Sequence, residues 1–465
     1  MDTKQRYILH DKNLIKGITM LSIPVILSNI LKSLHDVVDM YFVSKINMPA
    51  EIVDAQTAAI TVTSPIISLF LAFAMGLMIA GGAIISQYIG ANKTDKARLA
   101  SGQLLVCCFI VGVICNIGLY ASAPLIMRLM NAEGLIFDYS VTYLRYRSFE
   151  LIGLFIFYAY QATRQASGDT LSPVIINSSG IVLNVILTGI FINFLGMDLR
   201  GAAIGTVISN MIFIPVCLFL LFRNNDLNYR LTSDVLKLNP KMIRKLLYLG
   251  VPSALAQGLT SVGFMVVNTF SMRFDPAIIS AIGASNRINS LLLYPSMSVG
   301  GVLSTFVGQN IGANNPNRAR KSLHAALIIS LIIAVVGLCF FIPLRTEIVG
   351  LLISKNELSI TTARRYSLWI FLTLPLMSVF QCFNSCFQGT GRTDYSLWVS
   401  SARLWIFRIP VIFLMLDVFQ MDYMGIVYSM FFSNVMACIM CFIYYKKLDF
   451  LPRLNNLAKR MKNMS

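Results

Sequence analysis

Long apolar segments recur along this chain of 465 residues, and their length limits it to one class of fold. Twelve of them run for about 20–28 residues, the length that an α-helix needs to cross the hydrocarbon core of a bilayer. Only 13% of the residues are charged and the mean hydropathy is +0.70, whereas about a quarter of the residues of a soluble protein are charged. We therefore expect an all-α polytopic membrane protein with 12 transmembrane helices, at approximately residues 17–45, 55–81, 97–123, 139–162, 170–195, 201–222, 243–271, 277–305, 321–343, 364–387, 395–417 and 423–445.

The net charge of +17 is explained by orientation in a membrane better than by binding to nucleic acid. If the N-terminus is cytoplasmic, most Lys and Arg residues fall on that side, in the N-terminal stretch, Asn92–Arg98, Arg164–Asp169, Arg223–Lys245, Arg318–Lys321, Arg392–Asp394 and the tail from Lys446. This distribution satisfies the positive-inside rule. We therefore expect a multi-pass protein of the plasma membrane, of the bacterial inner-membrane type, with both termini cytoplasmic and no nucleic-acid partner. The basic tail predicts contacts with membrane lipid headgroups.

Neither a metal site nor an enzyme is indicated by the sequence. All nine cysteines lie in apolar segments, at spacings that suit neither metal ligands nor a disulfide framework. No HExxH, GxSxG or GxxxxGK motif occurs, so we expect no enzymatic activity and no cofactor. The polar first sixteen residues, without a clear cleavage site after them, predict that the first apolar segment is retained.

The chain contains an internal duplication. Ser86–Arg98 matches Gly308–Arg320 without a gap, with seven identities in thirteen positions. Six predicted helices separate the copies, and this even number makes the halves parallel rather than inverted repeats. Further matches at a similar separation relate Pro24, Gln165, Gly168 and Thr170 to Pro252, Gln388, Gly391 and Thr393.

The duplication predicts two lobes that face each other across a central cavity. We predict an N-lobe of residues 1–228 with transmembrane helices 1–6. The C-lobe is residues 229–465, with helices 7–12 and the basic cytoplasmic tail. Gly90 and Gly312 are predicted to cap the helices that precede the repeated loops.

The first apolar segment carries charges that a lipid-facing helix would not have. At about 100° per residue, Ser28, Lys32, His35, Asp36 and Asp39 fall within one arc of roughly 100°. An ionised carboxylate at the bilayer centre costs about 2.5–3.5 kcal/mol, so this arc should face water or polar partners. We predict that Asp39 is an ion-coupling carboxylate. Asp36 either shares this role or pairs with Lys32, one turn before it.

A second polar stripe lies on the fifth predicted helix. Helical spacing places Asn177, Asn184 and Thr188 on one face. Such a stripe serves either a functional site or hydrogen bonding between packed helices.

Several motifs together resemble the multidrug and toxic compound extrusion (MATE) family of secondary transporters. In chain order they are SIPVILSN, VVDMYFVSKI, SQYIGANKTDKAR, QASGDTLSP, VLNVILTGIFI, RGAAIGTVIS, GQNIGANNPNRAR and QGTGRT. The resemblance covers nearly the whole chain. It implies twelve helices in two lobes and an antiporter that exports small, amphipathic, often cationic organic compounds in exchange for H⁺ or Na⁺.

The resemblance also implies roles for individual residues. Asp39 matches the family's helix-one carboxylate, and Pro24 matches the proline near which that helix is thought to bend. Asn184 and Thr206 match members of a polar cluster in the N-lobe. Together with Asp39 and Thr188 they would supply oxygen ligands to a sodium ion, or form a proton relay.

The sequence departs from the family pattern at two of these positions. Thr188 stands where the family commonly has an Asp, which weakens the case for a sodium site built from two acids. Asp36 is an additional acid, one turn before Asp39. The C-lobe offers no replacement, because its first helix, Val251–Phe270, contains no acid. We therefore favour an N-lobe mechanism with a slight preference for protons.

The sequence indicates the residues that line the substrate cavity less clearly than those of the ion-coupling site. Asn177, Gln257, Asn268 and Arg287 are candidates to line it. Two other C-lobe arginines, Arg403 and Arg408, either reach the membrane interface with Arg287 or project with it into the cavity, where they would favour anionic or zwitterionic compounds.

A further charge cluster is predicted in the fourth segment. Glu150 lies close in sequence to Arg145 and Arg147, near a helix end. No role follows from this pattern alone.

The main alternative function is a flippase for lipid-linked oligosaccharides or lipids, built on a related two-lobe fold. A channel suits a two-lobe repeat less well than alternating access does. The expected partners are small organic substrates and membrane lipids, and we expect the monomer to be the functional unit.

Overall fold

The computed structural model describes residues 7–11, 13–44, 50–130, 132–223, 230–350 and 357–451, with side chains throughout except at residues 33–44, 50, 51 and 54. Within these ranges the chain forms helices and no strand. Eleven helical segments are long and apolar enough to span a membrane. The prediction of an all-α, multi-pass membrane protein is therefore confirmed.

The predicted number of twelve spans is not confirmed. The segment predicted at 139–162 is divided between α5 (Gly134–Ser148) and α6 (Glu150–Ala166), which meet at Phe149. Its charged residues lower its hydropathy, and it is not among the eleven spans.

The chain divides into two compact units, and each is described here by itself. The N-unit is Leu27–Gly258 and the C-unit is Met1–Ile26 with Leu259–Ser465. The long helices α2 (Leu14–Ser44) and α10 (Pro240–Ser271) each contribute residues to both units. The predicted lobe boundary at residues 228 and 229, which follows the repeat, stays a prediction.

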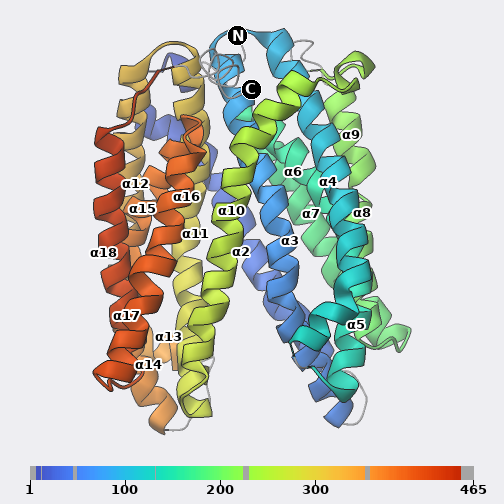
Figure 1. Cartoon of the computed structure of the whole chain (residues 1–465), viewed down its shortest axis with the longest axis vertical. Helices are drawn as coiled ribbons and strands as arrows, with labels where there is room; N and C mark the ends of the chain where they lie inside the picture. Colours follow the sequence, from blue (N-terminus) through green and yellow to red (C-terminus); the bar gives the residue numbers. More distant parts are fainter. Residues whose placement is uncertain are drawn as a thin grey trace. The chain divides into compact units, whose positions relative to one another are not determined.

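The N-unit consists of helices from the first sequence repeat (Figure 1). Besides parts of α2 and α10, it holds α3 (Ala50–Gly90), α4 (Thr94–Leu129), α5, α6, α7 (Leu171–Gly189), η1 (Ile190–Phe194), α8 (Leu199–Met211), α9 (Ile214–Phe222) and η2 (Ser233–Leu236). Small residues let its helices approach closely. A Cβ added at Gly76 of α3 would lie 2.5 Å from the backbone nitrogen of Ala254 of α10.

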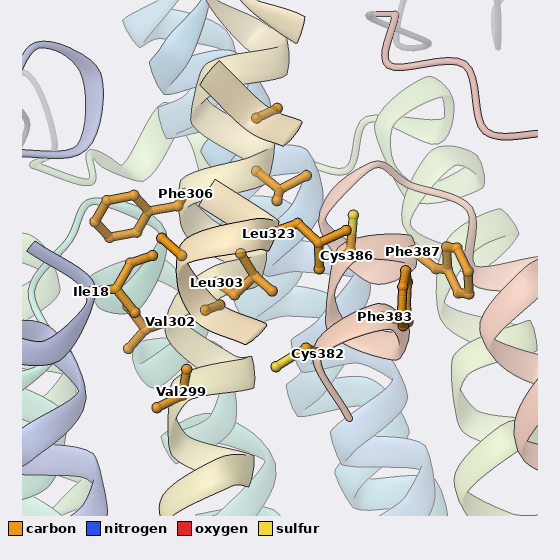
Figure 2. Close-up of a cluster of buried hydrophobic side chains, with 14 of the residues drawn as sticks. Ile18, Val299, Val302, Leu303, Phe306, Leu323, Cys382, Phe383, Cys386 and Phe387 are labelled. Atoms are coloured by element: carbon orange, nitrogen blue, oxygen red, sulfur yellow. The ribbon is translucent and has the colours of Figure 1, made fainter. Parts of the chain in front are cut away.

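The C-unit repeats this plan with helices from the second half (Figure 1). Its elements are α11 (Pro276–Gly312), α12 (Pro316–Phe341), α13 (Arg345–Gly350), α14 (Glu357–Leu372), α15 (Leu374–Gly389), α16 (Thr393–Ser401), η3 (Ala402–Arg408), α17 (Ile409–Phe413), η4 (Leu414–Val418) and α18 (Met424–Lys446). Figure 2 shows part of its core, where Ile18 of α2 lies beside Val302 of α11 and Cys382 belongs to α15.

The repeated loops have the same geometry in both halves. The helices end at Gly90 and Gly312 as predicted, but the residues with left-handed backbone are Asn92 (φ 55°) and Asn314 (φ 57°). The prediction that the glycines themselves cap the helices is therefore wrong in this detail. Asparagine adopts this conformation more readily than other residues with a Cβ, which explains why it follows each glycine by two residues.

Replacing Gly389 with Ala is expected to destabilise the C-unit. A Cβ at this position would lie 2.5 Å from the backbone oxygen of Ser304, so α11 and α15 would have to separate. Overpacking of this kind typically costs about 1–3 kcal/mol, which thermal unfolding of the purified protein in detergent measures. Gly301→Ala in α11 is the control, because no atom lies within 4 Å of a Cβ there. Equal unfolding temperatures for the two variants would contradict the argument.

Candidate functional site

Two residues predicted for the ion-coupling site meet between α7 and α8. The side-chain amide of Asn184 donates a hydrogen bond of 3.0 Å to the hydroxyl oxygen of Thr206. The Thr206 hydroxyl in turn donates to the carbonyl of Ala202, one turn earlier in α8. Both side chains are buried. This hydrogen bond therefore fixes a polar contact inside an otherwise apolar bundle.

Thr188 lies at the same crossing, one turn after Asn184. Its side chain is fully buried, and within the described part of the chain its hydroxyl oxygen has no hydrogen-bond partner. The close approach depends on Gly205 of α8, since a Cβ there would lie 3.0 Å from the Thr188 hydroxyl oxygen. A buried hydroxyl without a partner is costly unless a ligand or water satisfies it.

The two carboxylates of the predicted site fall in α2, but their side chains lie outside the described part of the structure. The backbone at Asp36 and Asp39 is helical, as predicted. Pro24 lies inside the same helix, which continues through it. The coupling roles of the aspartates and the hinge role of Pro24 stay predictions.

Asn177 connects the polar stripe of α7 to α2. Its side-chain amide donates a hydrogen bond of 3.0 Å to the hydroxyl of Ser28, which is buried. Asn177 also lines a small pocket with Ser209 and Asn210 of α8, next to Gly180. Asn177, the first residue of the predicted stripe, therefore borders a small, mostly apolar pocket in the N-unit.

Asn210 also contacts an ion pair that is formed by Arg147 and the buried Glu150. The Glu150 carboxylate is fully buried and forms an ion pair of 2.7 Å with Arg147, as its spacing in the sequence suggested. Asn210 donates to its second oxygen at 3.2 Å, and Arg147 also donates to the Tyr143 hydroxyl at 3.1 Å. The contact with Asn210 was not predicted, because no sequence pattern relates residues so far apart in the chain.

The other predicted cavity residues are distributed over both units. Gln257 is half-buried in the N-unit part of α10, while Asn268 and Arg287 are exposed in the C-unit. Their joint role in a substrate cavity stays a prediction.

The remaining two C-lobe arginines are buried. Arg403 and Arg408 expose only 4% and 2% of their surfaces, although they lie in a segment that could span the membrane. The prediction that they reach the membrane interface is wrong for the described structure. The surrounding helices enclose both side chains, which sequence alone did not reveal.

The side chains described at the crossing of α7 and α8 contribute neutral oxygen atoms. The described side chains contain no group of three His, Cys, Asp or Glu that could hold a metal ion. Amide and hydroxyl oxygens such as those of Asn184, Thr188 and Thr206 suit a weakly held monovalent cation or a chain of proton-carrying hydrogen bonds.

One family model matches both halves of the chain. The model described as MatE matches residues 24–190 and again residues 252–414, which together make up well over half of the chain. The duplication in the sequence is therefore a duplication of one family unit.

Relatives of known name align over most of the chain. "Probable multidrug resistance protein YoeA" of Bacillus subtilis is 24% identical over 459 residues, covering 96% of this chain and 97% of its own. "Multidrug export protein MepA" of Staphylococcus saprophyticus is 23% identical and covers 94% and 95%. A "FAD transporter" of Shewanella oneidensis is 24% identical and covers 80% and 82%.

A solved structure confirms the fold. A multidrug resistance MATE transporter of the MOP superfamily in an outward-facing conformation superposes with a TM-score of 0.89. It has 20% sequence identity, and the alignment covers 99% of each chain. This similarity shows the same architecture.

Proposed function

Because the chain belongs to the MATE family of membrane transporters, we propose that it exports small, amphipathic, often cationic organic compounds in exchange for an ion, by alternating access. The names of two relatives, a multidrug resistance protein and a multidrug export protein, support export of such compounds rather than flipping of lipids. We propose the plasma membrane as its location.

The observation that carries the coupling part of the proposal is the contact between α7 and α8. Asn184, Thr188 and Thr206 place buried polar atoms at one crossing of two candidate membrane-spanning helices. Polar groups are expensive at this depth, so their concentration at one crossing favours a functional site. Their positions in this sequence match the family's N-lobe cluster.

In the proposed mechanism Asp39 alternates between a charged and a neutral state. Protonation or binding of a cation removes the carboxylate's need for polar partners, and helix α2 then repacks near Pro24, where the backbone lacks one hydrogen-bond donor. The two states of Asp39 thereby favour different conformations. The ion drives transport only through its different affinity for these conformations.

We favour H⁺ over Na⁺ as the coupling ion. Sodium is best held by several oxygen ligands including acids, and Thr188 supplies a hydroxyl where a second carboxylate is common in the family. One carboxylate with neutral hydrogen-bonding neighbours suits a proton. Asp36 would assist only if it is not paired with Lys32.

Export from reconstituted vesicles tests the proposal. A fluorescent organic cation is loaded, and a pH gradient or a sodium gradient is imposed separately. We expect the pH gradient to drive efflux several-fold faster than in vesicles without protein. If neither gradient drives efflux by correctly folded protein, the substrate class is wrong and a lipid flippase becomes the better proposal.

A further inference from the structure

A π-helix in the C-unit brings two buried arginines onto one helix face. Arg403 and Arg408 both lie in η3, five residues apart. A regular α-helix would turn them about 140° away from each other, but π-helical hydrogen bonds join residues i and i+5 and place such residues one turn apart. Pro410 follows directly and has no backbone N–H to donate, which accounts for the disturbed helix here.

Neither guanidinium group is neutralised by a carboxylate in the described structure. Arg408 donates to the hydroxyl of Ser433 and to the side-chain oxygen of Asn434 of α18, both at 3.0 Å. Arg403 donates to the sulfur of Met377 at 3.2 Å, which is a weak acceptor. An arginine stays charged in proteins, and burying such a charge without a counter-charge is strongly unfavourable.

This cluster also contains hydrogen-bond donors that have no acceptor in the described part of the chain. Within the described residues, Arg403 Nε and Asn434 Nδ2 are both buried without any partner, and both are donors. Aromatic rings cover other sides, with Phe380 at 4.8 Å from the Arg403 guanidinium and Phe264 at 5.9 Å from that of Arg408. The site therefore has positive charge and spare donors, and it lacks an acceptor.

The sequence repeat identifies the equivalent place in the N-unit. Asp198 and Asp422 each accept a hydrogen bond from the backbone N–H two residues on, near the start of α8 and of α18. They are separated along the chain by the same interval as the first residues of the π-helices η1 and η4. At this interval Arg408 occupies the position of Asn184, while Ser433 and Asn434 occupy those of Ser209 and Asn210. One repeat thus has the neutral amide of Asn184 where the other has a guanidinium.

The N-unit also shows how a partly buried guanidinium is neutralised in this fold. There Arg147 contacts Tyr143 and forms an ion pair with Glu150. At the interval that relates the matched glycines Gly168 and Gly391, Tyr366 corresponds to Tyr143, but Thr373 corresponds to Glu150. Ile370 corresponds to Arg147, so the C-unit has the tyrosine but neither member of this ion pair.

We infer that Arg403 and Arg408 bind a small monovalent inorganic anion of the chloride class inside the C-unit. An anion accepts hydrogen bonds from every side and supplies the missing negative charge, so it meets both requirements of the cluster. The small exposure of both arginines excludes a bulky ligand from this place without rearrangement. This site is positively charged, whereas the equivalent described residues of the N-unit, Asn184, Ser209 and Asn210, are neutral.

The test is the thermal stability of the purified protein in sodium chloride, sodium bromide and sodium gluconate at equal concentration. Wild type is expected to unfold at a temperature higher by about 2–4 °C in either halide, with an effect that saturates as the halide concentration rises. Arg408→Gln is expected to lose this dependence and to be at least as stable as wild type in gluconate, because it no longer buries an unpaired charge. Arg273→Gln removes an exposed arginine of the same unit, and it should keep the full halide effect.

A second measurement does not depend on a folded variant. Crystals of wild type grown with bromide should show anomalous scattering beside the two guanidinium groups. An unfolding temperature that does not respond to halide would overturn the inference. So would stabilisation by an amphipathic carboxylate without stabilisation by halide, since that result would assign the charge to a transported substrate. Neither measurement requires transport, so failure of the exporter proposal would not affect them.

Discussion

Replacing Asp39 with Asn is expected to reduce gradient-driven export by at least about tenfold, a factor that corresponds to only about 1.4 kcal/mol. The amide has nearly the same shape as the carboxylic acid but carries no charge at any pH, so it cannot exchange a proton or attract a cation. The variant should resemble the neutral state of the transporter permanently. Efflux from vesicles under an imposed gradient measures the loss.

Substrate binding separates loss of coupling from loss of structure. Asp39→Asn should still bind the fluorescent cation, but its affinity should no longer change with pH or sodium concentration. Asp95→Asn provides the control, because Asp95 is exposed in the first turn of α4. Wild-type gradient dependence in the Asp39 variant would remove the helix-one carboxylate from the mechanism.

Replacing Glu150 with Gln is expected to cost about 3 kcal/mol of stability, the lower end of the range of about 3–5 kcal/mol for removing one partner of a buried ion pair. The cost arises because the positive charge of Arg147 then lacks its partner carboxylate. The lower end applies because the Arg147 side chain keeps 17% of its surface exposed and also bonds to Tyr143. Unfolding of the detergent-solubilised protein, followed by circular dichroism, measures the difference.

Two further variants make this result specific. Arg147→Met combined with Glu150→Gln should recover part of the loss, because the unpaired cation is then removed as well. Asp417→Asn breaks the exposed ion pair with Arg273, and it should cost less than about 1 kcal/mol. Equal costs for the buried and the exposed pair would show that Glu150 is not held as the structure describes.

Periodicity and length were sufficient to predict the features that repeat along the chain. Apolar length predicted a polytopic helical protein, and the duplication predicted two related halves. The common face of Asn184 and Thr188 followed from the period of the α-helix, and both side chains are buried as a site would require. The pairing of Asn184 with Thr206 was implied only by the family resemblance, since spacing alone does not tell which faces of two helices meet.

Other features depend on contacts that no local pattern encodes. The bond between Asn210 and Glu150 joins helices that are distant in the sequence. The burial of Arg403 and Arg408 was missed because a long cationic side chain in an apolar segment can usually reach the membrane interface. Their enclosure depends on the neighbouring helices and on a π-helix that hydropathy cannot reveal.

From the first repeated loop of each half onward, the interval between matched positions of the two halves grows along the chain. It is one residue longer between Gly168 and Gly391 than between Gly90 and Gly312, and it is longer by one more residue between η1 and η4. The stretch from Thr393 to Leu414 is therefore one residue longer than its counterpart in the first half, and it contains η3 where the first half has regular α7. The wider π-helical turn of η3 accommodates the extra residue inside a candidate membrane span, where there is no loop. Duplicated transporters can thus acquire a new polarity in one half by a change of length as well as by substitution.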